Sequence, residues 1–189
     1  DLVTGREEVL HRLRGPQTRV VPPIDVSIPT AGGSVIHAFL YASPASSRPP
    51  PLIVNLHGGP VNNSSPAYSP ATQFWLQQGY SWLDLNYRGS SGYGAAYRHA
   101  LRGNWGELDW RDAVTAAHHA IAAGWTAAGQ LAVRGASAGG FTALNALANS
   151  DVFAAGASYF GVADAARLPL ETHKFESGYL NSLIGPWPE

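Results

Sequence analysis

The chain has 189 residues, of which 45% are hydrophobic and 13% are charged, and its formal net charge is −1. This composition predicts one folded globular domain with a sizeable core and excludes an intrinsically disordered chain. The near-neutral charge, without a basic run, argues against nucleic acid as a partner. The longest apolar stretch falls short of the roughly 18 residues of a membrane span, which argues against a membrane.

The sequence begins with Asp1 and contains neither cysteine nor methionine. Without cysteine, disulfides, thiolate zinc sites and cysteine nucleophiles are excluded. Because a translated chain normally starts with methionine, we expect a piece of a longer protein. The lack of thiols suits either redox setting and leaves the compartment open. The cytoplasm is the expected compartment, and secretion is the alternative.

The N-terminal quarter predicts a β-hairpin that follows an ambiguous segment. Residues 1–15 fit either a short amphipathic helix or two strands joined by a Thr-Gly turn. After a Pro-flanked connector at 16–23, residues 24–29 and 34–42 alternate apolar and polar side chains around Ala-Gly-Gly. That alternation predicts two paired antiparallel strands, and the Pro-rich stretch 43–51 predicts a loop.

Strands and helices alternate from residue 52 onward. Strands are predicted at 52–57, 80–87, 131–135 and 152–162, and helices at 70–79, 105–124 and 138–150. Continuous apolar runs are typical of strands that are buried on both faces. The order predicts an α/β fold with a mostly parallel sheet, helices on both faces, and the hairpin at one edge.

Residues 135–139 read Gly-Ala-Ser-Ala-Gly and fit the G-x-S-x-G pattern of a nucleophile elbow. The motif lies between a predicted strand and a predicted helix, where such an elbow presents a serine hydroxyl at the carboxyl end of a sheet. Glycines two residues before and after Ser137 remove side chains that would collide in the tight turn. The alternative is a glycine-rich turn in which Ser137 caps the helix.

His57, Gly58, Gly59 and Pro60 follow the first buried strand. An acyl-transfer enzyme needs N–H donors aimed at the developing oxyanion. In an α/β hydrolase they come from the residue after the serine and from the loop after this strand. Ala138 is the first candidate donor. Because Pro60 has no N–H, the second donor is Gly58 or Gly59, and Gly59 is preferred. A plain turn is the alternative for this loop.

Four stretches together resemble the prolyl oligopeptidase family of serine peptidases, especially its acylaminoacyl-peptidase and aminopeptidase-like branch: HGGP (57–60), NYRGSSGYG (86–94), WGELDWRDA (105–113) and RGASAGGF (134–141). The resemblance covers roughly residues 20–189. It implies an α/β-hydrolase catalytic domain paired with an N-terminal β-propeller. Residues 1–21 are then the tail of a propeller-like segment with its connector, and residues 22–189 the peptidase domain.

The resemblance also implies roles for individual residues. Ser137 matches the nucleophile, and Gly59 and Ala138 match the oxyanion donors. Several relatives carry, at the position of His57, a tyrosine whose hydroxyl helps to bind the oxyanion, so a backbone amide is expected to carry that role here.

Candidate substrate-binding residues are His57, Phe175 and Tyr179. The last two lie in the segment that builds part of the pocket for the residue before the scissile bond, and core packing is the alternative for each. The stretches 86–94 and 105–113 are expected to be architecture, with Arg88 and Asp109 or Asp112 tying the loop to the helix start.

In α/β hydrolases the catalytic triad follows the order serine, acid, histidine. The family carries the acid and the histidine after two further strands, whereas this sequence stops one strand after Ser137. We therefore expect a domain without its C-terminal strands, which is nearly inactive in isolation because a serine needs an adjacent base. Asp164 and His173 follow in the right order and are the alternative partners.

The favoured function is a serine peptidase that hydrolyses short peptides through an acyl-enzyme at Ser137. A carboxylesterase with the same elbow and a non-catalytic hydrolase-like scaffold are the alternatives. No cofactor and no metal is expected, since no histidine or carboxylate cluster has ligand spacing. The expected partners are a small peptide substrate and, through the exposed edge strand, a second copy of the chain.

Overall fold

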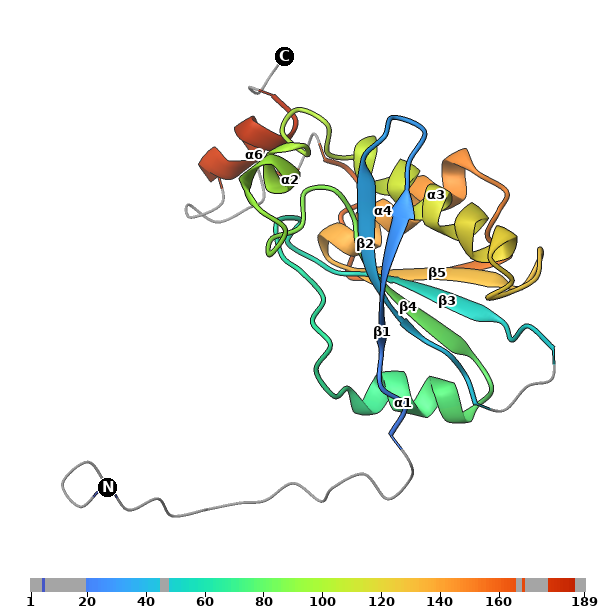
Figure 1. Ribbon diagram of the computed structural model, residues 1–189. Coiled ribbons are helices and arrows are strands. Elements are labelled where there is room, and N and C mark those ends of the chain that lie inside the picture. Colours follow the sequence, from blue (N-terminus) through green and yellow to red (C-terminus); the bar gives the residue numbers. More distant parts are fainter. Residues whose placement is uncertain (1–4, 6–19, 45–47, 166–167, 169–176, 186–189) are drawn as a thin grey trace.

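The computed structural model describes residues 5, 20–44, 48–165, 168 and 177–185 (Figure 1). Residues 1–4 and 6–19, which hold most of the predicted propeller-like tail, lie outside the described residues. So do two residues of the sequence-based site, His173 and Phe175. The domain boundary placed near residue 22 stays a prediction.

The described strands form one six-stranded sheet in the order β1-β2-β4-β3-β5-β6. β1 (Ile24–Pro29) and β2 (Val35–Tyr41) form the predicted antiparallel hairpin, and β2 also runs antiparallel to β4 (Ser81–Asn86). β4, β3 (Leu52–Leu56), β5 (Leu131–Ala136) and β6 (Ala155–Tyr159) are parallel to one another. The predicted mostly parallel sheet with a hairpin at one edge is confirmed.

Helices cover both faces of the sheet, as predicted. α1 (Pro70–Gln77) lies on one face, and α3 (Leu108–Ala122) and α4 (Ala138–Asn149) lie on the other (Figure 1). The start of α3, predicted at residue 105, is wrong. Gly106 has φ +89°, a left-handed conformation that no α-helix contains, and its N–H donates to the side chain of Asp109 over 2.7 Å.

Two short helices were not predicted. α2 (Ala95–His99) and α6 (Ser177–Leu183) have five and seven residues, too few for an apolar periodicity to stand out. They lie side by side at one end of the molecule (Figure 1). Two hydrogen bonds join α6 to the turn after α2, one from Gly103 N–H to the Ser182 carbonyl and one from Trp105 N–H to the Leu183 carbonyl, at 3.2 and 3.3 Å.

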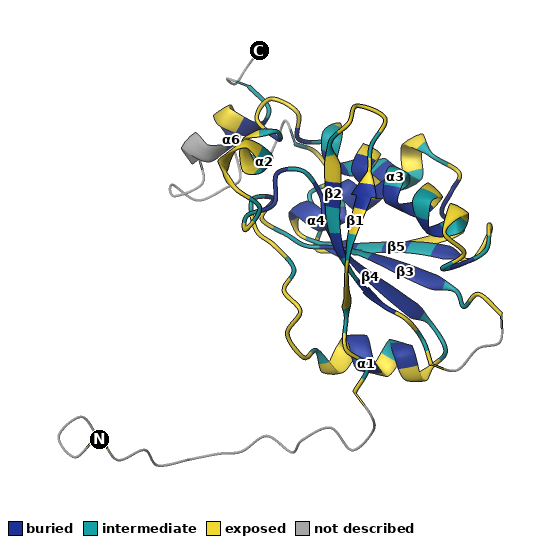
Figure 2. Ribbon diagram, in the orientation of Figure 1, coloured by how far each residue is buried: buried dark blue, intermediate teal, exposed yellow. Residues whose placement is uncertain are grey.

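Burial differs sharply between the centre and the margin of the sheet. Every residue of β4 is buried, and β3 is nearly as well covered (Figure 2). Every residue of β6 is exposed, and no described strand pairs with its outer edge. The exposed strand edge expected from the sequence is therefore present, while its use in self-association stays a prediction.

Among the described residues, no helix combines the length and the apolar character that crossing a membrane requires.

Candidate active site

Ser137 stands on a sharp turn between β5 and α4. Its backbone has φ 54° and ψ −123°, a conformation that residues other than glycine rarely adopt. Its N–H donates to the carbonyl of Tyr159 in β6 over 3.1 Å, and its side chain is exposed. Although Ser137 occupies the N-cap position, its hydroxyl makes no capping hydrogen bond with α4. The turn has the geometry predicted for a nucleophile elbow, and the helix-capping alternative is wrong.

Glycine permits this turn because backbone fills the space that a side chain would need. A Cβ on Gly135 would overlap the carbonyl of Gly139. A Cβ on Gly139 would overlap the carbonyl oxygen of Leu56 and lie 2.6 Å from that of His57. The second pair of contacts brings the start of α4 directly against the end of β3. The elbow and the loop that begins at His57 are therefore held together.

Gly59 and Ala138 are brought to Ser137 as the sequence predicted. A Cβ on Gly58 would lie 3.4 Å from the Cβ of Ser137, so the loop after β3 runs alongside the serine. Ala138 is the first residue of α4, and its N–H has no partner inside the helix. The same helix end adds positive potential. Gly59, Ser137 and Ala138 line one pocket, so the two residues expected to bind the oxyanion lie beside the serine.

That pocket has a volume of about 70 Å³, and its apolar walls are formed by Pro60, Trp105, Val162, Leu168 and Leu180. Trp105 is 6% exposed and packs edge-on against Phe141, with ring centroids 5.1 Å apart. Such walls suit an apolar group beside a reacting carbonyl. The sequence analysis missed Trp105, which lies in a stretch assigned to architecture, and Leu180.

His57 is held by its own neighbours. Its Nε2 lies 2.7 Å from Ser90 Oγ and its Nδ1 lies 2.9 Å from the Gly58 carbonyl, while the ring stacks on Tyr87 at 4.5 Å. Burial lowers the pKa of His57 to about 4, opposed by the Gly58 carbonyl, so the ring is neutral at pH 7. It is not among the residues lining the pocket beside Ser137, and its substrate contact stays a prediction.

The remaining sequence-based candidates are placed only in part. Phe175 and His173 lie outside the described residues. Tyr179 belongs to α6, whose Leu180 lines the serine pocket, but its side chain is not described. Asp164 is exposed in the loop after β6. In the described ranges, no group of three or more histidine and carboxylate side chains could hold a metal ion.

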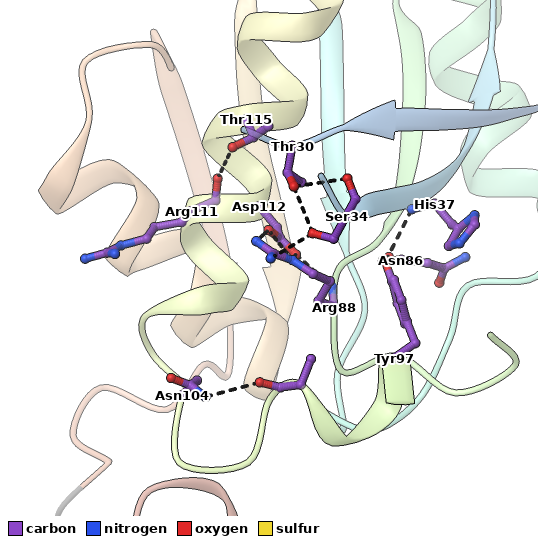
Figure 3. Close-up of polar contacts among 11 residues, drawn as sticks. Thr30, Ser34, His37, Asn86, Arg88, Tyr97, Asn104, Arg111, Asp112 and Thr115 are labelled. Carbon is purple, nitrogen blue, oxygen red and sulfur yellow. Dashed lines mark hydrogen bonds and ion pairs between the residues drawn. The ribbon is translucent and has the colours of Figure 1, made fainter. Parts of the chain in front are cut away.

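Two carboxylates of α3 fix the loops behind the site. Asp112 accepts the backbone N–H of Arg88 at 2.8 Å and pairs with its guanidinium (Figure 3). Asp109 accepts the N–H of Gly106 at 2.7 Å and the hydroxyl of Thr142 in α4. Burial raises the pKa of both carboxyls, and these hydrogen bonds oppose the shift. The predicted link between loop and helix is made by Asp112, whereas Asp109 links α3 to α4.

A polar cluster that the sequence analysis missed lies apart from the serine pocket, in a cavity of about 340 Å³. Asp84 accepts from Asn55 at 2.7 Å and from the indole of Trp82 at 2.8 Å, and Arg134 lies over the rings of Trp82 and Tyr159. Asn55 is paired in register with both Asp84 and Arg134. Three adjacent strands thus each contribute one polar residue at the same level of the sheet.

A mostly parallel sheet that presents a serine on a strained strand-to-helix turn, beside the start of a helix, is the arrangement of an α/β hydrolase. The sequence profile of the prolyl oligopeptidase family matches residues 66–188. The chain therefore belongs to the prolyl oligopeptidase family, and the resemblance seen in the sequence is confirmed.

Individual relatives agree with that assignment. The chain is 34% identical over 160 residues, 80% of its length, to an acylamino-acid-releasing enzyme of Arabidopsis thaliana. It is 35% identical over 117 residues, 61% of its length, to dipeptidyl aminopeptidase BIII of Pseudoxanthomonas mexicana. Its fold matches a puromycin-hydrolyzing peptidase of Mycobacterium tuberculosis over 100% of the chain, with 38% identity and a TM-score of 0.90. The chain spans 21%, 17% and 30% of these three proteins, respectively.

Proposed function

We propose that this chain carries the nucleophile and the oxyanion-binding amides of a serine peptidase that acts on short peptides. The hydroxyl oxygen of Ser137 attacks the peptide carbonyl and gives up its proton to a base. The N–H groups of Gly59 and Ala138 bind the oxyanion that forms. The carbon–nitrogen bond then breaks, the amine leaves with a proton, and water hydrolyses the ester on Ser137.

One observation carries this proposal: the exposed hydroxyl of Ser137 is held in a strained backbone conformation in the same pocket as Gly59 and Ala138. Strain of this kind persists where the surrounding structure over-determines it, and it is concentrated at functional sites. The apolar walls supplied by Trp105 and Leu180 offer a place for a substrate side chain.

The base is proposed to come from outside the described residues. No described histidine lines the pocket beside Ser137, and both ring nitrogens of His57 already face partners. Without a base, an oxyanion hole and substrate binding together give only about 10³ to 10⁴ over the uncatalysed rate. We therefore expect the isolated chain to be far less active than the full-length protein.

A small peptide is the proposed substrate. A puromycin hydrolase that carries a serine-to-alanine substitution has been solved in complex with PGG, and its fold matches this chain at a TM-score of 0.86 and 34% identity. That likeness supports a peptide-like ligand for the site around Ser137. The cytoplasm stays the proposed compartment.

The experiment is labelling by a fluorophosphonate, which reacts with activated serines, combined with hydrolysis assays. The full-length protein should be labelled and should cleave an aminoacyl amide faster than a short acyl ester. Ser137→Ala should abolish both, while Ser91→Ala, at a half-buried position in the loop after β4, should change neither. A faster ester reaction would favour the carboxylesterase, and no labelling of the full-length protein would favour the scaffold.

Pairing of β6 with a second copy of the chain is a separate proposal. It is supported by the exposure of every residue of β6 and by the unpaired outer edge of the strand in the described sheet. Light scattering over a range of concentrations tests it, and a monomer at every concentration would contradict it.

A further inference from the structure

A third pocket, with a volume of about 270 Å³, lies between α2 and α6. We call it the basic pocket, and its lining residues are Val61, Arg98, His99, Arg102, Ser182 and Leu183. Two arginines and a histidine border one cavity, and no carboxylate is among the described residues that line it. Arginine and histidine N–H groups are donors that match a carboxylate, and arginine can bind it in a bidentate fork.

The positive charge of this pocket is not compensated within the described structure. The described ion pairs are Arg88 with Asp112 and Arg111 with Glu107, and neither includes Arg98 or Arg102. The whole chain is nearly neutral, with 12 lysine and arginine residues against 13 acidic ones. A local excess of arginine in a neutral chain produces a positive potential that attracts an anion to this pocket.

The basic pocket shares three walls with the pocket beside Ser137. Pro60 lines the serine pocket and Val61, the next residue, lines the basic pocket. On α6, Leu180 faces the serine pocket and Leu183, one turn later, faces the basic pocket.

The third shared wall is the segment between α2 and α3, in which Arg102 lines the basic pocket and Trp105 the serine pocket. The hydrogen bonds from this segment to the carbonyls of Ser182 and Leu183 fix α6 against it. The two pockets are therefore neighbours, bordered by the same three segments of the chain.

We infer that the basic pocket binds a carboxylate of the peptide substrate while another part of that peptide lies at Ser137. This rests on the proposed peptidase function. Arg98 and Arg102 make charge-assisted hydrogen bonds to the carboxylate oxygens, and His99 adds an N–H. Val61 and Leu183 cover the aliphatic part of the residue that carries the carboxylate. The preferred substrates are short peptides with a free C-terminus, or with an acidic side chain, close to the cleaved bond.

The direct test measures binding without turnover. In the full-length protein with Ser137→Ala, calorimetry compares the tetrapeptide Ala-Phe-Ala-Ala with the same peptide ending in an amide. The acid should bind about tenfold more tightly, because two exposed arginines contribute charge-assisted hydrogen bonds. The difference should shrink when the salt concentration rises. Adding Arg98→Gln and Arg102→Gln should bring the two affinities to within about twofold of each other.

Two controls separate this role from a structural one. Arg111→Gln removes an arginine that pairs with Glu107 on the surface of α3, and it should leave the preference for the acid intact. In a second pair, both peptides end in an amide, and the last residue is Glu in one peptide and Gln in the other. A preference for Glu assigns the bound carboxylate to a side chain, whereas a preference confined to the first pair assigns it to the C-terminus.

Equal affinities for both members of both pairs would overturn the inference. An equal loss of affinity for the acid and the amide in the double arginine variant would also overturn it. In the hydrolysis assay, the same variant should lower kcat/KM for the acid and leave that for the amide unchanged. If peptides bind with the predicted preference but are never hydrolysed, the basic pocket stands and the peptidase proposal falls.

Discussion

Arg88 and Asp112 form a buried ion pair that joins the loop after β4 to α3. Asp112 is fully buried and Arg88 keeps 22% of its side chain exposed. The guanidinium Nε lies 3.0 Å from Asp112 Oδ2, and the same oxygen accepts the backbone N–H of Arg88 at 2.8 Å. One carboxylate thus fixes both the side chain and the backbone of the residue that begins the glycine-rich loop.

Replacing Asp112 by Asn should lower the free energy of unfolding by about 3 kcal/mol, because Arg88 would keep its charge without a counter-charge in a mostly buried place. Urea unfolding measures the loss. Glu107→Gln is the matched control, since it breaks an ion pair with Arg111 in which both side chains are 63% exposed. That change should cost less than about 0.5 kcal/mol. Similar losses in the two variants would contradict a structural role for the buried pair.

Gly139→Ala should destabilise the fold by about 3 kcal/mol or force the elbow away from the loop after β3. The added Cβ would overlap the Leu56 carbonyl, and because its close neighbours are all backbone atoms of Leu56 and His57, no side chain can move aside. Fluorophosphonate labelling of Ser137 in the full-length protein should slow as well. Gly32→Ala meets nothing within 4 Å and should change stability by less than about 0.5 kcal/mol. A Gly139→Ala variant with native stability and labelling would refute the close approach.

Thr142→Val should cost about 2 kcal/mol, since the threonine hydroxyl donates to the buried carboxylate of Asp109 and valine cannot replace that bond. Losing the donor should also raise the pKa of Asp109 further, because the hydrogen bond favours its charged form. Thr115→Val is the control, as the half-buried Thr115 donates to the Arg111 carbonyl in a solvent-exposed hydrogen bond. Chemical denaturation should show a larger loss of stability for Thr142→Val than for Thr115→Val. Equal stabilities would show that the hydrogen bond to Asp109 contributes nothing.

The stability of the protein should fall between pH 6.5 and pH 4 in a way that depends on His57. Burial lowers the pKa of His57 from 6.5 to about 4 in the folded state, so the unfolded chain binds more protons in this window. The histidine contributes nothing above pH 6.5, and it costs about 2 kcal/mol by pH 4 after allowance for its partial exposure.

His57→Gln should remove this part of the pH dependence while the amide keeps a contact with Ser90. Urea unfolding at pH 7, 6, 5 and 4 measures the difference between the two proteins, and pH 7 serves as the reference at which both side chains are neutral. The buried carboxyls of Asp84, Asp109 and Asp112 are common to both proteins, so their contributions cancel. Parallel curves over the whole range would show that His57 ionises freely in the folded state.

The sequence predicted the main features of the fold because they depend on local signals. Apolar runs gave the strands, and the alternation of strands with helices gave the parallel sheet. Gly135 and Gly139 marked the tight turn because their spacing around Ser137 reflects a local steric need. The helix start was placed too early because Gly106 adopts a left-handed conformation, and its N–H is bound by the side chain of Asp109 in the first turn of α3.

The walls of the two pockets could not be predicted because they depend on contacts between distant segments. Leu180 and Trp105 line one pocket, and Arg102 and Leu183 line the other. Both leucines belong to α6, a helix too short to be recognised in the sequence. Asn55, Asp84 and Arg134 lie in three separate strands, and only the register of the sheet shows that they are neighbours. A polar residue inside each of three buried strands was the available signal.

The hydrogen bond from the Ser137 amide to the Tyr159 carbonyl links the reactive residue to the least protected strand of the sheet. When β6 separates from β5, the Ser137 N–H loses its acceptor, and the strained backbone conformation of Ser137 can relax. The reactive conformation of Ser137 therefore depends on the pairing of β6 with β5. Amide exchange at Ser137 should keep pace with exchange along β6 rather than with the slowly exchanging interior of β5.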